Sequence, residues 1–294
     1  MTAADVAGLK KEFREDGVVL IRAGLDRESM RLAEEAYDWS LSHPSAGATT
    51  FSQKAAGKFY QDLANPLAFP VYRRLLEQSP CADLAAALWG ESDVWFMYEQ
   101  VFSKEGGAAR RTPWHQDSSY LPVAGENLLV VWISFDPVAE SNALEFVRGS
   151  HRGVLYNGSA FDPEDDTAPL YTSGGLPRLP NIEADRARWD IVAWATKPGD
   201  AVCFHPAMLH GGGPTEPGLR RRTLSLRFFG PDAIFSPRPA RAEVPGRRVD
   251  GESAQPTARD ESLEDGGPVF ARLAQTLSPG APFRHPGFPK VRPR

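Results

Sequence analysis

The chain has 294 residues, a formal net charge of −5 and a hydrophobic content of 41%. That content is enough for a sizeable core, and an elaborated β-barrel can reach this length as one domain. The negative charge gives no support to a nucleic-acid partner, because such a partner requires a broad basic surface. We therefore expect a single domain over residues 1–294 with no nucleic-acid partner.

Cysteine usage and the N-terminus bear on the cellular compartment. Only Cys81 and Cys203 occur, one in a helical pattern and one in an apolar strand pattern, which argues against a disulfide scaffold and suits a reducing cytoplasm. Residues 1–13 mix acids and bases without an apolar run, so they do not resemble a signal peptide. No stretch approaches the length of a membrane span. We predict a cytoplasmic protein with no membrane attachment.

Helical patterns dominate residues 1–92. The patterns predict helices over residues 5–15, 28–41 and 81–89, helix starts at 65–66 and 79–80, and one strand over residues 18–21. Asp26 can cap the second helix, and Gly90 can end the third. We expect these helices to pack on the outside of a barrel.

From residue 93 the pattern changes to strands. Apolar runs rich in β-branched and aromatic residues predict strands over residues 93–102, 128–135, 200–205 and 222–229. Trp95, Trp132, Phe228 and Phe229 are expected to be core residues first, because large aromatics supply much of the buried area of a β-barrel.

Two segments lack a regular pattern. Residues 153–192 are acidic and punctuated by proline and glycine, so they can form a lid over a site or simple surface decoration. Residues 231–294 are rich in proline, glycine and charge, with a candidate helix over 268–277, and can wrap the barrel or remain mobile. Four arginines of this tail form a basic cluster that we expect to be solvated or carboxylate-paired, with contact to an anionic substrate as the alternative: Arg238, Arg241, Arg247 and Arg248.

Segment 112–117 (TPWHQD) places His115 and Asp117 two positions apart. In a strand such side chains project from the same face, so an imidazole and a carboxylate can bind one ion while Gln116 points away. The pattern is weak alone, but His210 lies behind another predicted strand and before three glycines, which let backbone approach a crowded site. His210 is the candidate third ligand, and His205 is the alternative.

Two histidines and one carboxylate on one side of an octahedral ion leave the opposite positions open. This suits non-haem Fe(II), which must bind a cosubstrate and dioxygen (O2) together. Arg221 follows His210 and opens a strand.

Taken in order, these pieces resemble the phytanoyl-CoA dioxygenase family of Fe(II)/2-oxoglutarate-dependent oxygenases. The resemblance covers the chain from about Phe13 to about Gly230. It rests on residues 13–20 (FREDGVVL), 100–104 (QVFSK), 112–117 (TPWHQD), 141–151 (SNALEFVRGSH), 198–200 (PGD), 210–211 (HG) and 221–225 (RRTLS). The usual Pro-Gly-Ser-His of the family is RGSH here, and SNA replaces the commoner Asn-Gly-Ala, but both departures lie outside the metal set.

The resemblance implies a fold and a site. The fold is mainly β with flanking helices, a cupin-like double-stranded β-helix (jelly roll) over residues 93–230, with a helical flank over 1–92 and an extension over 231–294. The implied Fe(II) ligands are His115, Asp117 and His210. The implied residues for the cosubstrate 2-oxoglutarate are Arg221 at its distal carboxylate, with Gln100 and Trp132 lining the pocket. An α-keto acid fills two open positions of the ion, and its far carboxylate then needs a cation, for which arginine is better suited than lysine. Only the resemblance assigns this role to Arg221; Arg220 and Arg222 would alternate to the opposite face and remain alternatives.

The resemblance also implies a reaction, in which a dioxygenase oxidises an unactivated C–H bond of a small organic substrate and releases succinate and CO2. Hydroxylation is the default outcome, with desaturation or ring formation also open. Related halogenating enzymes carry a small residue where Asp117 stands here, so oxidation is favoured over halogenation. Ser118, Ser119 and Tyr120 directly follow the ligand carboxylate and are expected to face the substrate.

Two functions of other classes compete with this interpretation. A zinc-dependent hydrolase could use the same ligand set, although it leaves Arg221 without a role. A non-catalytic jelly-roll module could bind a small acid, because one scaffold hosts many functions.

Overall fold

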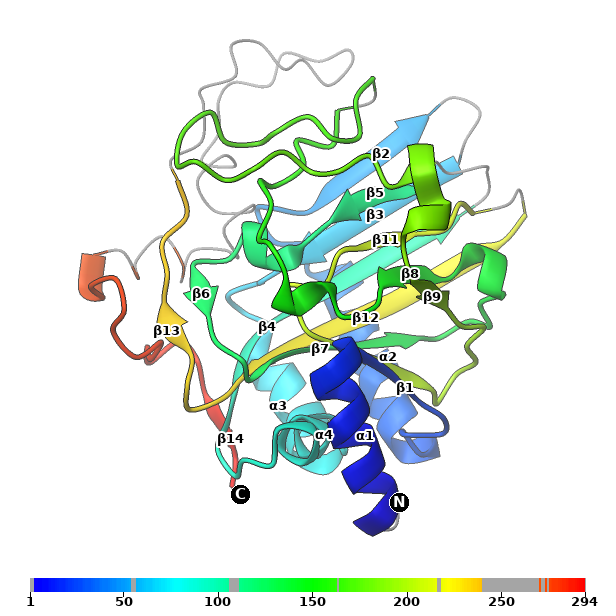
Figure 1. The fold of residues 1–294 in the computed structure, drawn as a ribbon. Helices are drawn as coiled ribbons and strands as arrows, with labels where there is room; N and C mark the ends of the chain where they lie inside the picture. Colours follow the sequence, from blue (N-terminus) through cyan, green and yellow to red (C-terminus); the bar gives the residue numbers. More distant parts are fainter. Residues whose placement is uncertain are drawn as a thin grey trace.

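The computed structural model describes residues 3–53, 57–105, 111–162, 164–215, 218–239, 270, 273 and 275–293. These residues form a large and a small antiparallel sheet, with the helices gathered on one side of the large sheet (Figure 1). The two sheets pack together through buried residues such as Trp132, Phe146 and Phe204. The predicted jelly-roll fold class is confirmed.

The large sheet has the strand order β1-β10-β7-β12-β4-β3-β2, and β14 also pairs with β4. Its strands are β1 (Val18–Ile21), β2 (Thr49–Gln53), β3 (Gly57–Leu63), β4 (Val94–Glu105), β7 (Leu128–Ser134), β10 (Ala201–Phe204), β12 (Arg220–Phe229) and β14 (Lys290–Arg292). The four strands predicted after residue 93 are confirmed with small shifts at their ends.

The small sheet has the order β5-β11-β8-β9, and a two-stranded sheet pairs β13 with β6. These strands are β5 (Thr112–His115), β6 (Val123–Ala124), β8 (Leu144–Val147), β9 (Ile191–Ala193), β11 (His210–Gly212) and β13 (Ile234–Phe235). Short 3₁₀ turns lie between strands at η1 (Asp117–Ser119), η2 (Glu140–Asn142), η3 (Ser150–Arg152) and η4 (Glu183–Arg188).

Four helices precede most of the strands: α1 (Ala3–Asp16), α2 (Arg27–Ser42), α3 (Phe69–Gln78) and α4 (Cys81–Trp89). Asp26 caps α2 by accepting a hydrogen bond from the Ser29 amide at 2.8 Å, and Gly90 ends α4 with a φ of 76°. The predicted start at Asn65 is wrong, because its side chain accepts from the Leu67 amide in a turn and α3 begins only at Phe69. None of the helices in the described residues is both long and apolar enough to cross a bilayer.

The first ninety residues are less helical than predicted. Besides β1, they contain β2 and β3, which extend the large sheet beyond β4. Both strands are rich in polar residues, so an apolar pattern did not mark them.

The C-terminal tail packs on the barrel in its described part. β13 pairs with β6, β14 pairs with β4, and Phe283 and Phe288 enter a core cluster with Phe229. The expected solvated or carboxylate-paired state is wrong for Arg238, which donates to the backbone carbonyls of Ser118 at 2.8 Å and Val123 at 2.9 Å. Half of the candidate helix over 268–277 lies outside the described residues, as do Arg241, Arg247 and Arg248.

Strand β12 shows how the large sheet separates its two faces. Leu224, Leu226 and Phe228 project outward into the core shared with the helices. The alternate positions, which include Ser225 and Arg227, project toward the small sheet, as the period of two requires. One face of this strand therefore builds the core, and the other faces the space between the sheets.

Candidate metal centre and cosubstrate site

His115 and His210 meet across the small sheet. β5 ends at His115, β11 begins at His210, and the two residues are direct partners in the ladder with ring centroids 4.2 Å apart. Asp117 Oδ1 lies 3.5 Å from His115 Nε2 and 3.8 Å from His210 Nε2. Each of these three buried residues offers one potential ligand atom, and the three atoms lie within 4.8 Å of one another. Among the described residues, this is the single group of this kind. These three side chains can contact one ion.

Asp117 reaches the histidines by a turn and not by strand alternation. The strand ends at His115, Gln116 is extended, and Asp117 opens η1. Gln116 does point away as predicted. Its side-chain nitrogen donates to the carbonyls of Val154 and Ala207, and its side-chain oxygen accepts from the backbone amide of Tyr156. These bonds fix the segment that carries the carboxylate.

The two imidazoles are oriented as metal ligands. His115 Nδ1 lies 2.8 Å from the Pro113 carbonyl, and His210 Nδ1 lies 3.0 Å from the Met208 carbonyl. A carbonyl can only accept, so each Nδ1 carries the proton and each Nε2 lone pair faces the centre. Burial, helped by the nearby His115 ring, lowers the pKa of His210 to about 4, which keeps that imidazole neutral.

Arg227 binds the other oxygen of the carboxylate. Its Nη2 donates to Asp117 Oδ2 at 2.8 Å and to Gln100 Oε1 at 2.7 Å. Burial alone would raise the pKa of Asp117, but Arg227 and the two histidines outweigh it and hold this pKa well below its usual range. The carboxyl group is therefore ionised and ready to bind a cation.

His205, the alternative ligand, has a different role. Its Nε2 lies 3.1 Å from the Gly125 carbonyl, and its Nδ1 accepts from the Ala207 amide at 3.0 Å. Both ring nitrogens are thus engaged with backbone, and the ring does not join the group formed by His115 and Asp117.

A second cationic region lies on the inner face of the large sheet. Lys104 on β4 is the direct partner of Arg221 on β12, so both side chains project from the same face. Lys104 is only 6% exposed and lies against the Phe59 ring, and Arg221 donates to the Asn142 carbonyl. Burial, and secondly Arg221, lower the pKa of Lys104 to about 7, and burial lowers that of Arg221 to about 10. Within the described residues, neither cation forms an ion pair with a carboxylate.

The neighbouring arginines alternate to the other face. Arg222 pairs with Asp136 at 3.2 Å and with Glu34 of α2 at 2.8 Å. Arg220 lies 3.6 Å from Asp136 and is exposed. Of the three consecutive arginines, Arg221 is therefore the one that shares the inner face with Gln100 and Trp132, which both lie opposite Ser225.

The loop after β8 covers the candidate metal centre. Ser119 Oγ donates to the Tyr156 carbonyl at 2.8 Å, and the Tyr171 hydroxyl donates to the Ser119 carbonyl at 2.9 Å. The Tyr120 hydroxyl accepts from the Ser159 amide at 2.8 Å, and the Phe161 ring lies 5.4 Å from the His115 ring. These contacts favour a lid over surface decoration for this part of the loop.

The three residues predicted to face substrate differ in exposure. Ser118 and Ser119 are buried, whereas Tyr120 is partly exposed and stacks on Phe161 with ring centroids 6.1 Å apart. The 41% exposure of Phe161 places it at the surface beside the metal ligands.

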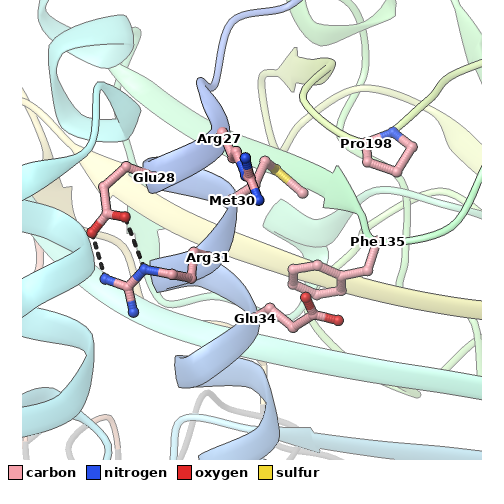
Figure 2. Close-up of a pocket in the computed structure, with 7 residues that line it drawn as sticks. All are labelled: Arg27, Glu28, Met30, Arg31, Glu34, Phe135 and Pro198. Carbon is pink, nitrogen blue, oxygen red and sulfur yellow. Dashed lines mark hydrogen bonds and ion pairs between the residues drawn. The ribbon is translucent and has the colours of Figure 1, made fainter.

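A cavity of about 500 Å³ lies elsewhere, beside α2 on the helical side of the large sheet (Figure 2). It is lined by Arg27, Glu28, Met30, Arg31, Glu34, Phe135 and Pro198. Its acidic groups are already paired, Glu28 with Arg31 and Glu34 with Arg222. This cavity contains no part of the candidate metal centre.

Comparison with known proteins identifies the family. The family model for phytanoyl-CoA dioxygenase (PhyH) matches residues 13–223. The chain belongs to this family. It is 27% identical to human peroxisomal phytanoyl-CoA dioxygenase over 49% of the chain and 41% of that relative. It is 25% identical to a probable alpha-ketoglutarate-dependent hypophosphite dioxygenase of Stutzerimonas stutzeri over 60% of the chain and 59% of the relative.

The chain spans about half the length of the curated relatives it matches. Solved structures match it over nearly its whole length, including the alpha-ketoglutarate-dependent epimerase SnoN, with a TM-score of 0.64, 21% identity and coverage of 100% of this chain and 98% of that one. The carbocyclase SnoK gives a TM-score of 0.65 at 18% identity, covering 99% and 96%. The predicted resemblance is confirmed. The Stutzerimonas stutzeri relative is named as alpha-ketoglutarate-dependent, and one SnoN structure is a complex with Fe3+ and alpha ketoglutarate.

Two residues of the site were missed in the sequence. Arg227 lies six positions after Arg221 and Lys104 lies four after Gln100, so strand alternation places each pair on one face. Arg227 could have been noticed as a charged residue within the apolar strand pattern 222–229, whereas Lys104 lies two positions beyond the predicted end of its strand.

Proposed function

We propose that this chain is an Fe(II)- and 2-oxoglutarate-dependent dioxygenase. It would oxidise an unactivated C–H bond of a small organic substrate and release succinate and CO2. The observation that carries the proposal is the convergence of two buried imidazoles and one buried carboxylate, together with the inner face of the large sheet that bears Arg221 and Lys104. Two histidines and one carboxylate suit Fe(II), and the two cations suit the distal carboxylate of 2-oxoglutarate.

In this proposal, His115, Asp117 and His210 hold the iron. Their donor atoms converge from one side, where β5, η1 and β11 meet, which leaves the other side to ligands from solution. When bound, iron and 2-oxoglutarate supply the oxidising power, and the protein supplies orientation and the exclusion of side reactions.

Arg221 and Lys104 would bind the distal carboxylate of 2-oxoglutarate. A buried cation beside a partly buried one is unfavourable without a counter-charge, and a bound carboxylate lowers that cost. Gln100 and Trp132 lie on the same face and would line the pocket. This arrangement extends the predicted cosubstrate set by one residue, Lys104.

The lid loop would limit access of water to the metal. Tyr120 and Phe161 border the site and are proposed to contact substrate, whereas the substrate contacts predicted for Ser118 and Ser119 remain predictions. Hydroxylation is the proposed default. The names of the relatives include dioxygenases of different substrates, so none of those substrates is assigned to this chain.

A zinc-dependent hydrolase could use the same three ligands. It would leave the buried Lys104 and the partly buried Arg221 without an anion. We further propose a reducing, cytoplasmic setting, which is supported by two buried free thiols at Cys81 and Cys203.

Succinate release tests the proposal without knowledge of the substrate. Metal-free protein would be incubated in air with Fe(II) and 2-oxoglutarate, and both 2-oxoglutarate and succinate would be quantified. We expect slow conversion by the parent protein and none by Asp117→Ala. Zn(II) binding together with ester or amide hydrolysis, and no succinate under any condition, would favour the hydrolase instead.

A further inference from the structure

The two oxygens of the Asp117 carboxylate have different environments. Oδ1 faces the imidazoles of His115 and His210 at 3.5 and 3.8 Å. Oδ2 accepts a hydrogen bond from Arg227 Nη2 at 2.8 Å. A charge-assisted bond of this length engages Oδ2, the oxygen that does not face the imidazoles at these distances.

This difference bears on how many positions of the ion stay open. A carboxylate can ligate through one oxygen or through both. With two histidines and one oxygen, three positions of an octahedral ion remain, enough for a chelating keto acid and dioxygen. If both oxygens ligated, only two positions would remain, and the keto acid would fill them.

Arg227 is held at one guanidinium nitrogen and against an aromatic ring. The residue is 6% exposed, its Nη2 also donates to Gln100 Oε1 at 2.7 Å, and its guanidinium carbon lies 4.7 Å from the centre of the Tyr98 ring. Its Nε and Nη1 are buried without a hydrogen-bond partner among the described residues. The residue belongs to the middle of the large sheet, where β12 pairs with both β4 and β7. A side chain fixed in this way can hold the carboxylate in one orientation.

We propose that Arg227 is a positioning residue that confines Asp117 to one-oxygen ligation and so keeps a third position of the ion open. The inference rests on the proposed function, because it requires iron at the three ligands. An Arg227–Asp117 ion pair that only stabilised the fold would affect folding and leave the number of open positions on the ion unchanged.

The test counts open positions with nitric oxide as a probe that takes the place of dioxygen. Anaerobic Fe(II) and 2-oxoglutarate would be added to the parent, Arg227→Met, Arg227→Lys and Arg222→Met proteins. The visible charge-transfer band of the keto-acid complex would be recorded first, and nitric oxide would then be titrated and followed by electron paramagnetic resonance.

We expect Arg227→Met to keep the charge-transfer band and to bind nitric oxide about tenfold more weakly, the scale on which partners of a metal ligand act. Arg227→Lys keeps a cationic donor and should recover part of the loss. Arg222→Met, on the opposite face of the same strand, should match the parent. Equal nitric oxide affinity in Arg227→Met and the parent, with the band intact, would overturn the inference but not the proposed function.

A second measurement uses no variant and therefore does not depend on whether Arg227→Met folds. In a crystal structure of the parent with Fe(II) bound, Asp117 should contact the metal through one oxygen and Arg227 through the other. Contact of both oxygens with the metal would overturn the inference. Absence of both iron and the charge-transfer band in the parent would instead remove the proposed function on which it rests.

Discussion

The two faces of β12 carry opposite kinds of residue. On the outer face, Leu224, Leu226 and Phe228 are fully buried against the helices, and Arg222 is paired with carboxylates. On the inner face, Arg227 is bound to a metal-ligand carboxylate and Arg221 lies opposite Lys104 with no carboxylate partner in the described residues. The charged residue of the outer face is paired with carboxylates of the protein, whereas Arg221 and Lys104 on the inner face are available to pair with an anionic ligand.

One strand can therefore contribute to stability with one face and to ligand binding with the other, because adjacent side chains project from opposite faces. Burial of apolar groups stabilises the fold, whereas burial of charges without partners opposes it. Substitutions on the outer face should therefore alter stability alone, and substitutions on the inner side should alter ligand binding. The following predictions test that separation, beginning with the largest effect.

His210→Ala should abolish Fe(II) binding, because it removes one of only three ligands. Equilibrium dialysis of the metal-free protein against Fe(II) under anaerobic conditions measures this directly. His205→Ala is the matched control, since His205 is equally buried but bonds only to backbone. Full iron binding by His210→Ala and loss in His205→Ala would reverse the ligand assignment.

Leu226→Ala should lower the free energy of unfolding by about 2–5 kcal/mol, the usual range for a fully buried leucine. Denaturant titration of the metal-free protein measures the change. The Fe(II) affinity of the folded variant should equal that of the parent. A large loss of iron affinity would show that the two faces are not independent.

Arg221→Ala should weaken 2-oxoglutarate binding by about 2–3 kcal/mol, the scale of hydrogen bonds to a charged group, and leave iron binding unchanged. Calorimetric titration of the anaerobic Fe(II) protein with 2-oxoglutarate measures this. Arg222→Ala provides the control, because it removes a neighbouring arginine from the outer face. If both variants bind as the parent does, the distal carboxylate must lie elsewhere.

Lys104 should make 2-oxoglutarate binding depend on pH. Burial and Arg221 lower its pKa to about 7, and Phe59 covers it from β3. A bound carboxylate favours the protonated form, so binding takes up a proton and affinity should fall as pH rises above 7. Lys104→Met should bind more weakly at pH 6, by about tenfold, and lose most of this dependence between pH 6 and 8. An unchanged profile in Lys104→Met would exclude the lysine from the site.

The grouping of the three candidate ligands could be predicted because their signals are local. His115 and Asp117 are close in sequence, and His210 stands before glycines at the end of a strand pattern. The path between the first two was not predicted, because the turn at η1 depends on bonds from Gln116 to residues far along the chain.

Other parts of the site depend on pairings that no local pattern shows. Lys104 can be recognised as part of the candidate cosubstrate site only once β4 and β12 pair, because this pairing places it opposite Arg221. The lid is fixed by contacts such as that of Tyr120 with Ser159, which lie far apart in sequence. Strands β2 and β3 are polar and gain their place by pairing with β4, so sequence periodicity gave little sign of them.

The most direct test of the central claim is an anaerobic titration of the metal-free protein with Fe(II) and then 2-oxoglutarate. Chelation by the keto acid produces a weak visible charge-transfer band, which the parent protein should show and Asp117→Ala should lack. No band in the parent, together with tight binding of Zn(II), would contradict the account and favour a hydrolase or a binding module.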